Sequence, residues 1–420
     1  MKIFNKYSGI LRTLGPGLLW AGAAIGVSHL VQSTRAGAGY GYALIWIVIL
    51  ANLLKYPFFE FGPRYAASTG KTLISGYYNL GRWVLVLYLI LTFLTMFTIQ
   101  AAVTIVTAGI LYWVSGNMFS PLIWSAIILF LITILLLSGK YSVLDRSIKI
   151  IIILLSITTF IALAFAIGKF GLKLNSSTMF PDIWNKKGIL FMIALMGWMP
   201  SAIDISVWSS IWSIEKQKEC GFKPSLKQVL FDFNLGYIGT SVISLSFIIL
   251  GALLIFGSGI SLSPQGGKFA GQFIGIYTGS IGNWSLYIVT IAALTTMFST
   301  TLTCVDAFSR VLDLSFKKLF TPEKNDDNQK YHILWKLLIV FGALILLSIF
   351  QSSMGFMVDL ATTLSFLTAP FLAIINFKVI TGKEIKGDFR IPKWLFFLSI
   401  AGIIFLVVFS FIFLYVRFFY

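Results

Sequence analysis

The chain has 420 residues, of which 58% are hydrophobic and only 11% are charged, and its mean hydropathy is +0.90. A soluble protein keeps roughly a quarter of its residues charged, so this composition excludes an ordinary soluble domain. The formal net charge of +17 does not indicate a nucleic-acid partner, because Lys and Arg lie in short connectors between apolar runs. The runs are continuous rather than alternating, which excludes a β-barrel. We therefore expect an all-α membrane protein whose surroundings are the lipid bilayer.

Many of the apolar runs exceed the ~18 residues that distinguish a membrane span from a buried core helix. We predict about eleven transmembrane helices, and an odd number of spans places the two termini on opposite sides of the membrane. The predicted spans cover residues 14–34, 42–63, 84–114, 121–138, 148–169, 188–213, 229–256, 284–309, 333–350, 355–378 and 393–418.

Basic residues are concentrated in alternate connectors between these spans. By the positive-inside rule, this pattern predicts a cytoplasmic N-terminus and an extracytoplasmic C-terminus for a multi-pass protein of the cell membrane, plasma or inner. The basic connectors include Lys2, Lys6 and Arg12; Arg64, Lys71 and Arg82; Lys216, Lys218, Lys223 and Lys227; and Lys378, Lys383, Lys386 and Arg390.

Two of the predicted spans are interrupted near mid-membrane. The first contains Gly22 and Gly26, and the sixth contains Gly197 followed by Pro200. One such interruption would suit a simple helix kink. Two interruptions at equivalent positions of inverted halves are typical of the central site of a secondary transporter.

The interrupted spans are the first members of two groups of five helices. Because five is odd, the second group must be inverted relative to the first. We therefore predict one transmembrane transporter domain, residues 1–420, made of a first five-helix repeat at 14–170, a second inverted five-helix repeat at 188–378, and an additional helix at 393–418.

Several short motifs, most of them in the first seventy residues, form a recognisable set. They are Gly15-Pro16-Gly17-Leu18-Leu19, Arg35-Ala36-Gly37-Ala38, Gly41-Tyr42, Leu50-Ala51-Asn52-Leu53-Leu54, Thr69-Gly70-Lys71 and, in span six, Met199-Pro200. This set resembles Nramp transporters. The resemblance implies a LeuT-type inverted-repeat fold with broken helices 1 and 6, alternating access, and proton-coupled uptake of divalent metals such as manganese and iron.

The departures from the Nramp pattern fall on the metal site. Where that family has Asp-Pro-Gly-Asn, this chain reads Gly26-Val27-Ser28-His29, so the Asp and Asn oxygen ligands are absent. Met199 keeps the family's thioether ligand, but Ser201 stands in place of a His. A dehydrated divalent ion needs formal negative charge nearby. We therefore expect an Nramp-like secondary transporter whose remodelled site moves a small anion or polar solute rather than a bare transition metal.

The candidate binding residues surround the two interruptions, where half-helix amino ends favour anionic groups. His29 and Asp204 form a candidate coupling pair, because an imidazole titrates near neutral pH and a carboxylate would stabilise its charged form. His29 and Met199 could instead ligate a soft or borderline metal. The substrate-binding candidates are Gly26, Ser28, His29, Gln32, Met196, Met199 and Ser201.

Several of these polar residues also have a structural interpretation. His29 could be a core histidine hydrogen-bonded to span six, and Asp204 could pair with Arg35. Asp359 is expected at the membrane interface. Residues four apart on one helix can pair along it, which predicts ion pairs of Glu60 with Arg64 and of Asp306 with Arg310.

Two other functions stay open on the sequence alone. One is a proton-coupled divalent metal cation transporter with altered coordination, and the other is a non-transporting sensor or scaffold. In either transporter, protons are a candidate coupling ion and the substrate is a small solute or ion. No nucleotide-binding, nucleophile or zinc-protease motif occurs, so we expect neither enzyme activity nor a cofactor.

Overall fold

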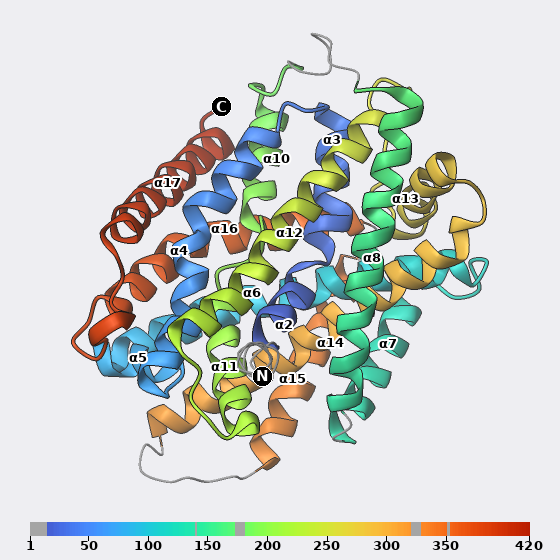
Figure 1. The fold of residues 1–420 in the computed structure, drawn as a ribbon. Coiled ribbons are helices and arrows are strands. Elements are labelled where there is room, and N and C mark those ends of the chain that lie inside the picture. The colour runs from blue at the N-terminus through green and yellow to red at the C-terminus, as the bar shows by residue number, and fades with distance from the viewer. Residues whose placement is uncertain (1–14, 139–140, 173–180, 321–328, 351–352) are drawn as a thin grey trace, which may run out of the picture.

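In the computed structural model the described residues form helices and the connectors between them, without a strand among them (Figure 1), which confirms the predicted fold class. The basic residues Lys2, Lys6 and Arg12 and the start of the predicted first span lie outside the described part. The described residues are 15–138, 141–172, 181–320, 329–350 and 353–420, without the side chains of 141–152 and 329–330.

Eight of the described helices are long and apolar enough to cross a membrane. Together with the shorter apolar helix α7 and two interrupted spans, they correspond to the eleven predicted crossings. The eight are α4 (Ile45–Thr69), α6 (Arg82–Val114), α8 (Tyr141–Phe170), α12 (Leu226–Leu254), α14 (Ser285–Phe320), α15 (Gln329–Ile349), α16 (Met354–Ile380) and α17 (Lys393–Phe418), and α7 covers Pro121–Leu137.

The first and sixth spans are each divided, as the sequence predicts. The first consists of α2 (Pro16–Ala24), the π-helical segment η1 (Ser28–Ser33) and α3 (Thr34–Tyr40). The sixth consists of α10 (Lys186–Gly197) and α11 (Ile205–Cys220). Non-helical backbone at membrane depth is tolerated only where other parts of the protein surround it.

Three short helical elements in connectors were not predicted. They are α5 (Leu73–Leu80), α13 (Gly266–Ile281) and the 3₁₀ turn η2 (Gly387–Phe389). Both α5 and α13 are amphipathic and too short to span a bilayer. A search for long apolar runs does not detect such helices.

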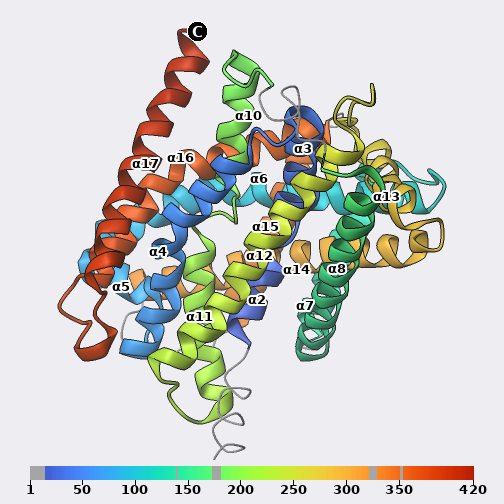
Figure 2. The same cartoon turned by 45° about the horizontal axis from the view of Figure 1, so that its top comes forward.

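Helix α12 packs along both halves of the first span (Figures 1 and 2). The backbones approach closely because glycine lies at the contacts: a Cβ atom on Gly17 would lie 2.0 Å from the carbonyl oxygen of Asp232, and one on Gly37 would lie 1.9 Å from that of Ile248. Small residues at such contacts are typical of helix packing in membranes. The first span is thus held at the centre of the bundle.

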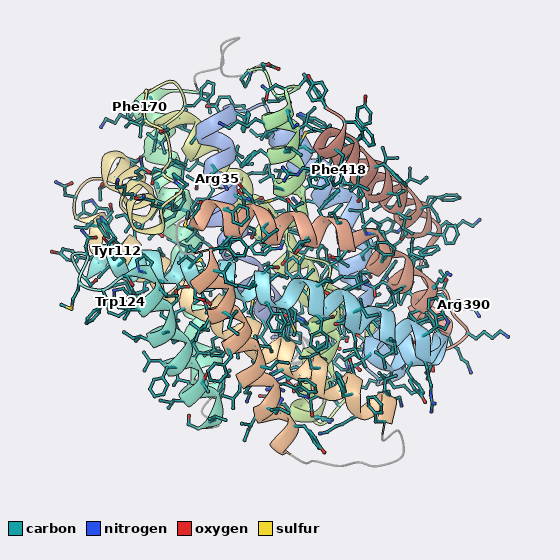
Figure 3. All side chains as sticks on the ribbon, turned by 180° about the vertical axis from the view of Figure 1, so that it is seen from behind. Arg35, Tyr112, Trp124, Phe170, Arg390 and Phe418 are labelled. Carbon is teal, nitrogen blue, oxygen red and sulfur yellow. The ribbon has the colours of Figure 1, made fainter. Side chains whose placement is uncertain are left out.

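Large apolar side chains cover the periphery of the molecule (Figure 3). Phe418 at the end of α17 is 73% exposed, and exposed aromatic and aliphatic residues also lie on α6, α8 and α15. A soluble protein rarely exposes so much contiguous apolar surface, whereas a bilayer accommodates it. The protein is therefore a multi-pass membrane protein.

Candidate functional site

The first interruption lies between α2 and η1. Helix α2 ends at Ala24, Ile25 has extended backbone angles (φ −75°, ψ 91°), and helical structure resumes at Val27, directly before η1. Ser28 Oγ donates to the carbonyl of Ala24 at 2.8 Å. Thr300 Oγ1 of α14 lies 3.3 Å from the carbonyl oxygens of Gly22 and Ile25. Neutral hydroxyl groups therefore contact the carbonyls around this interruption.

His29 is fully buried and its ring contacts α12. Its Nε2 lies 3.0 Å from the carbonyl oxygen of Thr240, and because a carbonyl only accepts, Nε2 is the donor. Its Nδ1 lies 2.7 Å from Ser28 Oγ, whose single proton serves either this nitrogen of the neutral ring or the Ala24 carbonyl. Both ring nitrogens are thus engaged by protein atoms, and the partner helix is α12 rather than span six.

The second interruption lies between Gly197, where α10 ends, and Ile205, where α11 begins. Asp204 occupies the N-cap position of α11, where a carboxylate meets the positive end of the helix dipole. Asp204 is buried, and no described residue forms a hydrogen bond with its Oδ1. A carboxylate oxygen without a protein partner therefore lies at this interruption.

Lys55 of α4 reaches the opposite side of the same interruption. Its side chain is fully buried, and its Nζ donates to three backbone carbonyls, those of Met196 (3.1 Å), Gly197 (3.1 Å) and Ser201 (2.8 Å). The first two carbonyls belong to the end of α10, which is the negative end of its dipole. The two half-helix ends of span six are thus each complemented by a side chain of opposite charge, Lys55 and Asp204.

A cavity of about 40 Å³ lies between the two interruptions. Its polar lining residues include Ser28, Ser201, Asp204, Thr300 and Cys304. One water molecule needs roughly 10–15 Å³ of such cavity volume. The observed space suits a small ion or a few waters, and it is too small for an organic solute of many atoms.

Three of the predicted site residues, Ser28, Ser201 and Asp204, line this cavity. Gly26 packs instead against Thr300, whose side chain would lie 2.9 Å from a Cβ atom at position 26. His29 has its own partners, so the structure does not bring the predicted pair of His29 and Asp204 into hydrogen-bond contact.

Two predicted methionines have other contacts. Met199 Sδ accepts a hydrogen bond from Ser33 Oγ at 3.9 Å. Met196 is fully buried and contributes its backbone carbonyl to the Lys55 ammonium. Neither side chain lines the cavity.

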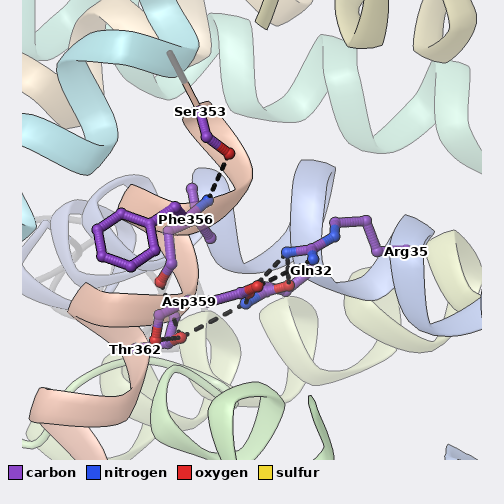
Figure 4. A network of polar contacts seen from close by, with 7 residues as sticks. Gln32, Arg35, Ser353, Phe356, Asp359 and Thr362 are labelled. Carbon is purple, nitrogen blue, oxygen red and sulfur yellow. Dashed lines mark hydrogen bonds and ion pairs between the residues drawn. The ribbon is translucent and has the colours of Figure 1, made fainter. Parts of the chain in front are cut away.

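Gln32, the remaining predicted binding residue, belongs to a polar network that joins the first span to α16 (Figure 4). Its Nε2 donates to Asp359 Oδ1 at 3.0 Å. Arg35 makes a two-point ion pair with the same carboxylate, from Nη1 to Oδ1 at 2.7 Å and from Nη2 to Oδ2 at 3.0 Å. Arg35 pairs with Asp359, so the alternative pairing of Arg35 with Asp204 is wrong.

The carboxylate of Asp232 joins the beginning of the first span to α12. Its two oxygens accept hydrogen bonds from the backbone N–H groups of Gly15 (3.0 Å) and Gly17 (2.6 Å). The first span is therefore attached to neighbouring helices on both sides of its interruption, by Asp232 before it and by Arg35 after it.

The predicted ion pairs along single helices are confirmed. Arg64 Nη2 lies 2.6 Å from Glu60 Oε1 within α4, where both side chains are buried. Arg310 Nε lies 2.7 Å from Asp306 Oδ2 within α14, and Arg310 also contacts Glu215 of α11. These pairs lie away from the cavity lining.

The sequence analysis missed Lys55 and Asp232. A signal for both was present, since each is a charged residue inside a predicted membrane span, and such residues usually have a functional or structural partner. Their partners are backbone groups of distant segments, which no side-chain motif could identify. Among the described residues, no group of three or more His, Cys, Asp or Glu side chains could hold a metal ion.

The comparisons with known sequences give the family. A family model described as natural resistance-associated macrophage protein-like, Nramp, matches residues 17–416. An uncharacterized protein of Pasteurella multocida, PM0681, is 37% identical over 407 residues, covering 96% of this chain and 91% of that protein. The divalent metal cation transporter MntH of Verminephrobacter eiseniae is 35% identical over 66 residues, which is 16% of this chain and 15% of that protein.

Solved structures agree in fold. A manganese transporter of Eremococcus coleocola superposes with a TM-score of 0.71 at 14% identity, covering 97% of this chain and 86% of that chain. MhsT in complex with L-phenylalanine gives a TM-score of 0.66 at 14% identity, covering 96% and 98% respectively. These likenesses confirm the LeuT-type fold. Because the family model matches nearly the whole length, the chain belongs to the Nramp family of membrane transporters.

Proposed function

We propose that this protein is a secondary transporter that works by alternating access and carries a small cation through the cavity between its two interruptions. The main support is the buried Asp204 carboxylate, which lines the cavity and has no described hydrogen-bond partner at Oδ1. A buried carboxylate that lacks a protein partner is stabilised by a proton, a bound cation or water in the cavity, because an unpaired charge away from these is strongly unfavourable.

An anion is less suited to this cavity than the sequence suggested. The positive end of α11 already meets a carboxylate, and the Lys55 ammonium already donates to three carbonyls. An anion would therefore face Asp204 without a free positive partner among the described lining residues. Repulsion between like charges favours a cation or a neutral species instead.

The charge of the site favours a singly charged cation. Asp204 supplies the only carboxylate of the described cavity lining, and the other polar lining groups are hydroxyls, a thiol and the indole N–H groups of Trp198 and Trp208, all of them neutral. A dehydrated divalent ion would keep an excess positive charge there, because the Lys55 ammonium of α4 donates to the Ser201 carbonyl of the same linking segment. Transport of a divalent metal is the second candidate, favoured by the fold shared with a manganese transporter.

The contacts on either side of the first interruption suit alternating access. Asp232 holds the residues before the interruption against α12, and Arg35 holds those after it against α16. We propose that these two attachments break in turn, with the Asp232 side facing the cytoplasm. A proton and the cation would compete for Asp204, so we propose protons as the coupling ion, in exchange for the cation.

The test is cation flux into proteoliposomes containing the purified protein. Uptake of Na⁺, K⁺, Rb⁺ and Mn²⁺ is compared between wild type, Asp204→Asn and the control Ser201→Ala, whose residue lies on the same linking segment. Loss of an interaction with a charged group is worth roughly 1.5–3 kcal/mol, so Asp204→Asn should lower cation flux by at least about tenfold. Ser201→Ala should lower it far less.

Cation flux that is unchanged in Asp204→Asn would contradict the proposed role of the carboxylate. Flux of Mn²⁺ above that of every monovalent cation would favour the second candidate. A third outcome is that the protein carries an anion and no cation, and that the anion flux is unchanged in Asp204→Asn. This result would contradict the proposal and support the anion transport that the sequence suggested.

A further inference from the structure

Among the described residues, the Lys55 ammonium donates to backbone carbonyl oxygens alone, which form a cradle around it. Its three carbonyl partners lie at 2.8–3.1 Å, and they come from both sides of the interruption in span six, Met196 and Gly197 before it and Ser201 after it. A lysine ammonium has three N–H donors, so the three carbonyls can use all of them. The ring of Phe59 lies on another side, with Nζ 5.7 Å from its centroid.

Placing an ammonium here is unfavourable unless the surrounding groups compensate for the water that it loses. The carbonyls provide that compensation, and they need a partner themselves. Those of Met196 and Gly197 lie in the last turn of α10, where intrahelical N–H donors run out, and that of Met196 also accepts from the backbone N–H of Met199 at 3.4 Å. Without a cation between them, the negative ends of these carbonyl dipoles would face one another at membrane depth, which is unfavourable.

Converging backbone carbonyls are also what proteins use to bind exchangeable cations. Rings of carbonyl oxygens replace the hydration shell of a monovalent ion in channel filters. The cradle at Lys55 has the same chemistry, but its occupant is covalently attached to α4. The protonated amine therefore supplies a single positive charge between these carbonyls.

We propose that Lys55 is a tethered cation: its ammonium fills a monovalent-cation site formed by the carbonyls of Met196, Gly197 and Ser201, and so determines which cations can approach span six. The site holds the interruption in shape without needing a bound ion. Its fixed charge also disfavours a divalent cation near this segment, since repulsion grows with the charge of the ion. Lys55 Nζ and these three carbonyl oxygens are distinct from the carboxylate of Asp204.

The proposal predicts that removing the ammonium creates a site for a free cation. We would purify wild type, Lys55→Ala and Lys55→Met in detergent and measure thermal unfolding in the chloride salts of potassium, methylammonium and choline at equal ionic strength. Potassium and methylammonium fit among three carbonyls, and methylammonium can also donate hydrogen bonds. Choline is bulky and has no N–H group, so it serves as the reference salt.

The matched control is Lys336→Ala. Lys336 of α15 is also buried, but its Nζ contacts a single described carbonyl, that of Leu136, at 3.4 Å. Lys55→Ala and Lys55→Met should lose several degrees of Tm in choline and recover a substantial part in potassium or methylammonium. Wild type and Lys336→Ala should unfold at the same temperature in all three salts.

A Lys55 variant whose Tm is the same in all three salts would overturn the proposal, and so would a Lys336→Ala variant that gains as much from potassium. If Lys55→Ala is recovered as monodisperse protein only when methylammonium is present during purification, the proposal is supported. If neither Lys55 variant is recovered in any of the salts, Lys55 is an ordinary structural residue and the proposal is wrong. None of these measurements requires transport, so the result is independent of the role of Asp204.

Discussion

The two interruptions at the centre of the protein are built from different chemistry. At the first, the surrounding groups are neutral: the hydroxyls of Ser28 and Thr300 and the ring of His29 contact backbone carbonyls. At the second, the half-helix ends meet full charges, the Lys55 ammonium and the Asp204 carboxylate. Both spans are broken at membrane depth, but among the described residues charged side chains meet the half-helix ends at the second break alone.

This difference indicates a division of roles. Neutral hydrogen bonds at the first interruption contribute to stability and do not change with the charge of the substrate. Charges at the second interruption interact with any ion that enters the cavity, and their effect is large where water is excluded. Substitutions at the first interruption should therefore change stability, whereas substitutions at the second should change ion selectivity as well as stability.

The largest effect that this comparison predicts is on stability at the first interruption. His29→Ala removes two hydrogen bonds and leaves a cavity, so it should lower the free energy of unfolding by roughly 2–4 kcal/mol. The measurement is denaturant or thermal unfolding in detergent, together with the pH profile of flux. His332→Ala, at the half-buried second histidine of the chain, is the control and should change stability little. If His29→Ala is as stable as wild type and its flux no longer depends on pH, His29 is a coupling residue.

A second prediction converts the neutral interruption into a charged one. Gly26→Asp places a carboxylate where the resemblance implies a metal ligand, but the side chain of Thr300 would lie 2.9 Å from the new Cβ atom. The double variant Gly26→Asp with Thr300→Ala should therefore bind manganese about tenfold more tightly than Thr300→Ala alone, because a carboxylate offsets the ion's charge. Calorimetry on purified protein measures this, and equal affinities would show that the first interruption does not contact the ion.

A third and smaller effect concerns the charges that flank the first interruption. The Arg35–Asp359 pair is partly solvated, with side chains 23% and 40% exposed. A double-mutant cycle with Arg35→Ala and Asp359→Ala should give a coupling energy of about 0.2–1 kcal/mol in unfolding, as is usual for exposed pairs. A coupling of several kcal/mol would mean that this pair, rather than the neutral core of the interruption, holds the first span in place.

The smallest effect lies far from both interruptions, at Glu384 in the connector before α17. Partial burial raises the pKa of Glu384, but hydrogen bonds from Tyr65, Lys71 and Asn79 outweigh it, so the pKa lies below its ordinary value of 4.5. A lowered pKa means that Glu384 stabilises the fold above about pH 4.5 and that this contribution is lost as the pH falls through the lowered pKa.

The Tm of wild type should therefore exceed that of Glu384→Gln at pH 6 and approach it in acid. Cation flux at neutral pH should be the same in both, because Glu384 is remote from the cavity. A difference in Tm that persists unchanged at low pH would show that the carboxylate charge is not what stabilises the connector.

Much of the architecture was predictable from the sequence because the bilayer imposes a local rule. A span needs a long run of apolar residues, and the predicted limits 84–114, 121–138 and 393–418 agree with α6, α7 and α17 to within two residues. The interruptions were predictable for a similar reason, since Gly26 and Pro200 mark backbone that does not continue a regular helix. The short helices α5 and α13 follow no such rule and were missed.

The contents of the site were decided by tertiary structure. Ser28, Ser201 and Asp204 were predicted as site residues and line the cavity, whereas His29 turned out to contact α12 and Gln32 to contact α16. Which neighbour a buried polar group meets depends on how distant helices pack. The sequence alone determined where the helices cross the membrane and where two of them break, because those properties depend on nearby residues. Only the packed structure decided that a lysine from α4 would meet the carbonyls of one break, because that contact joins segments about 140 residues apart.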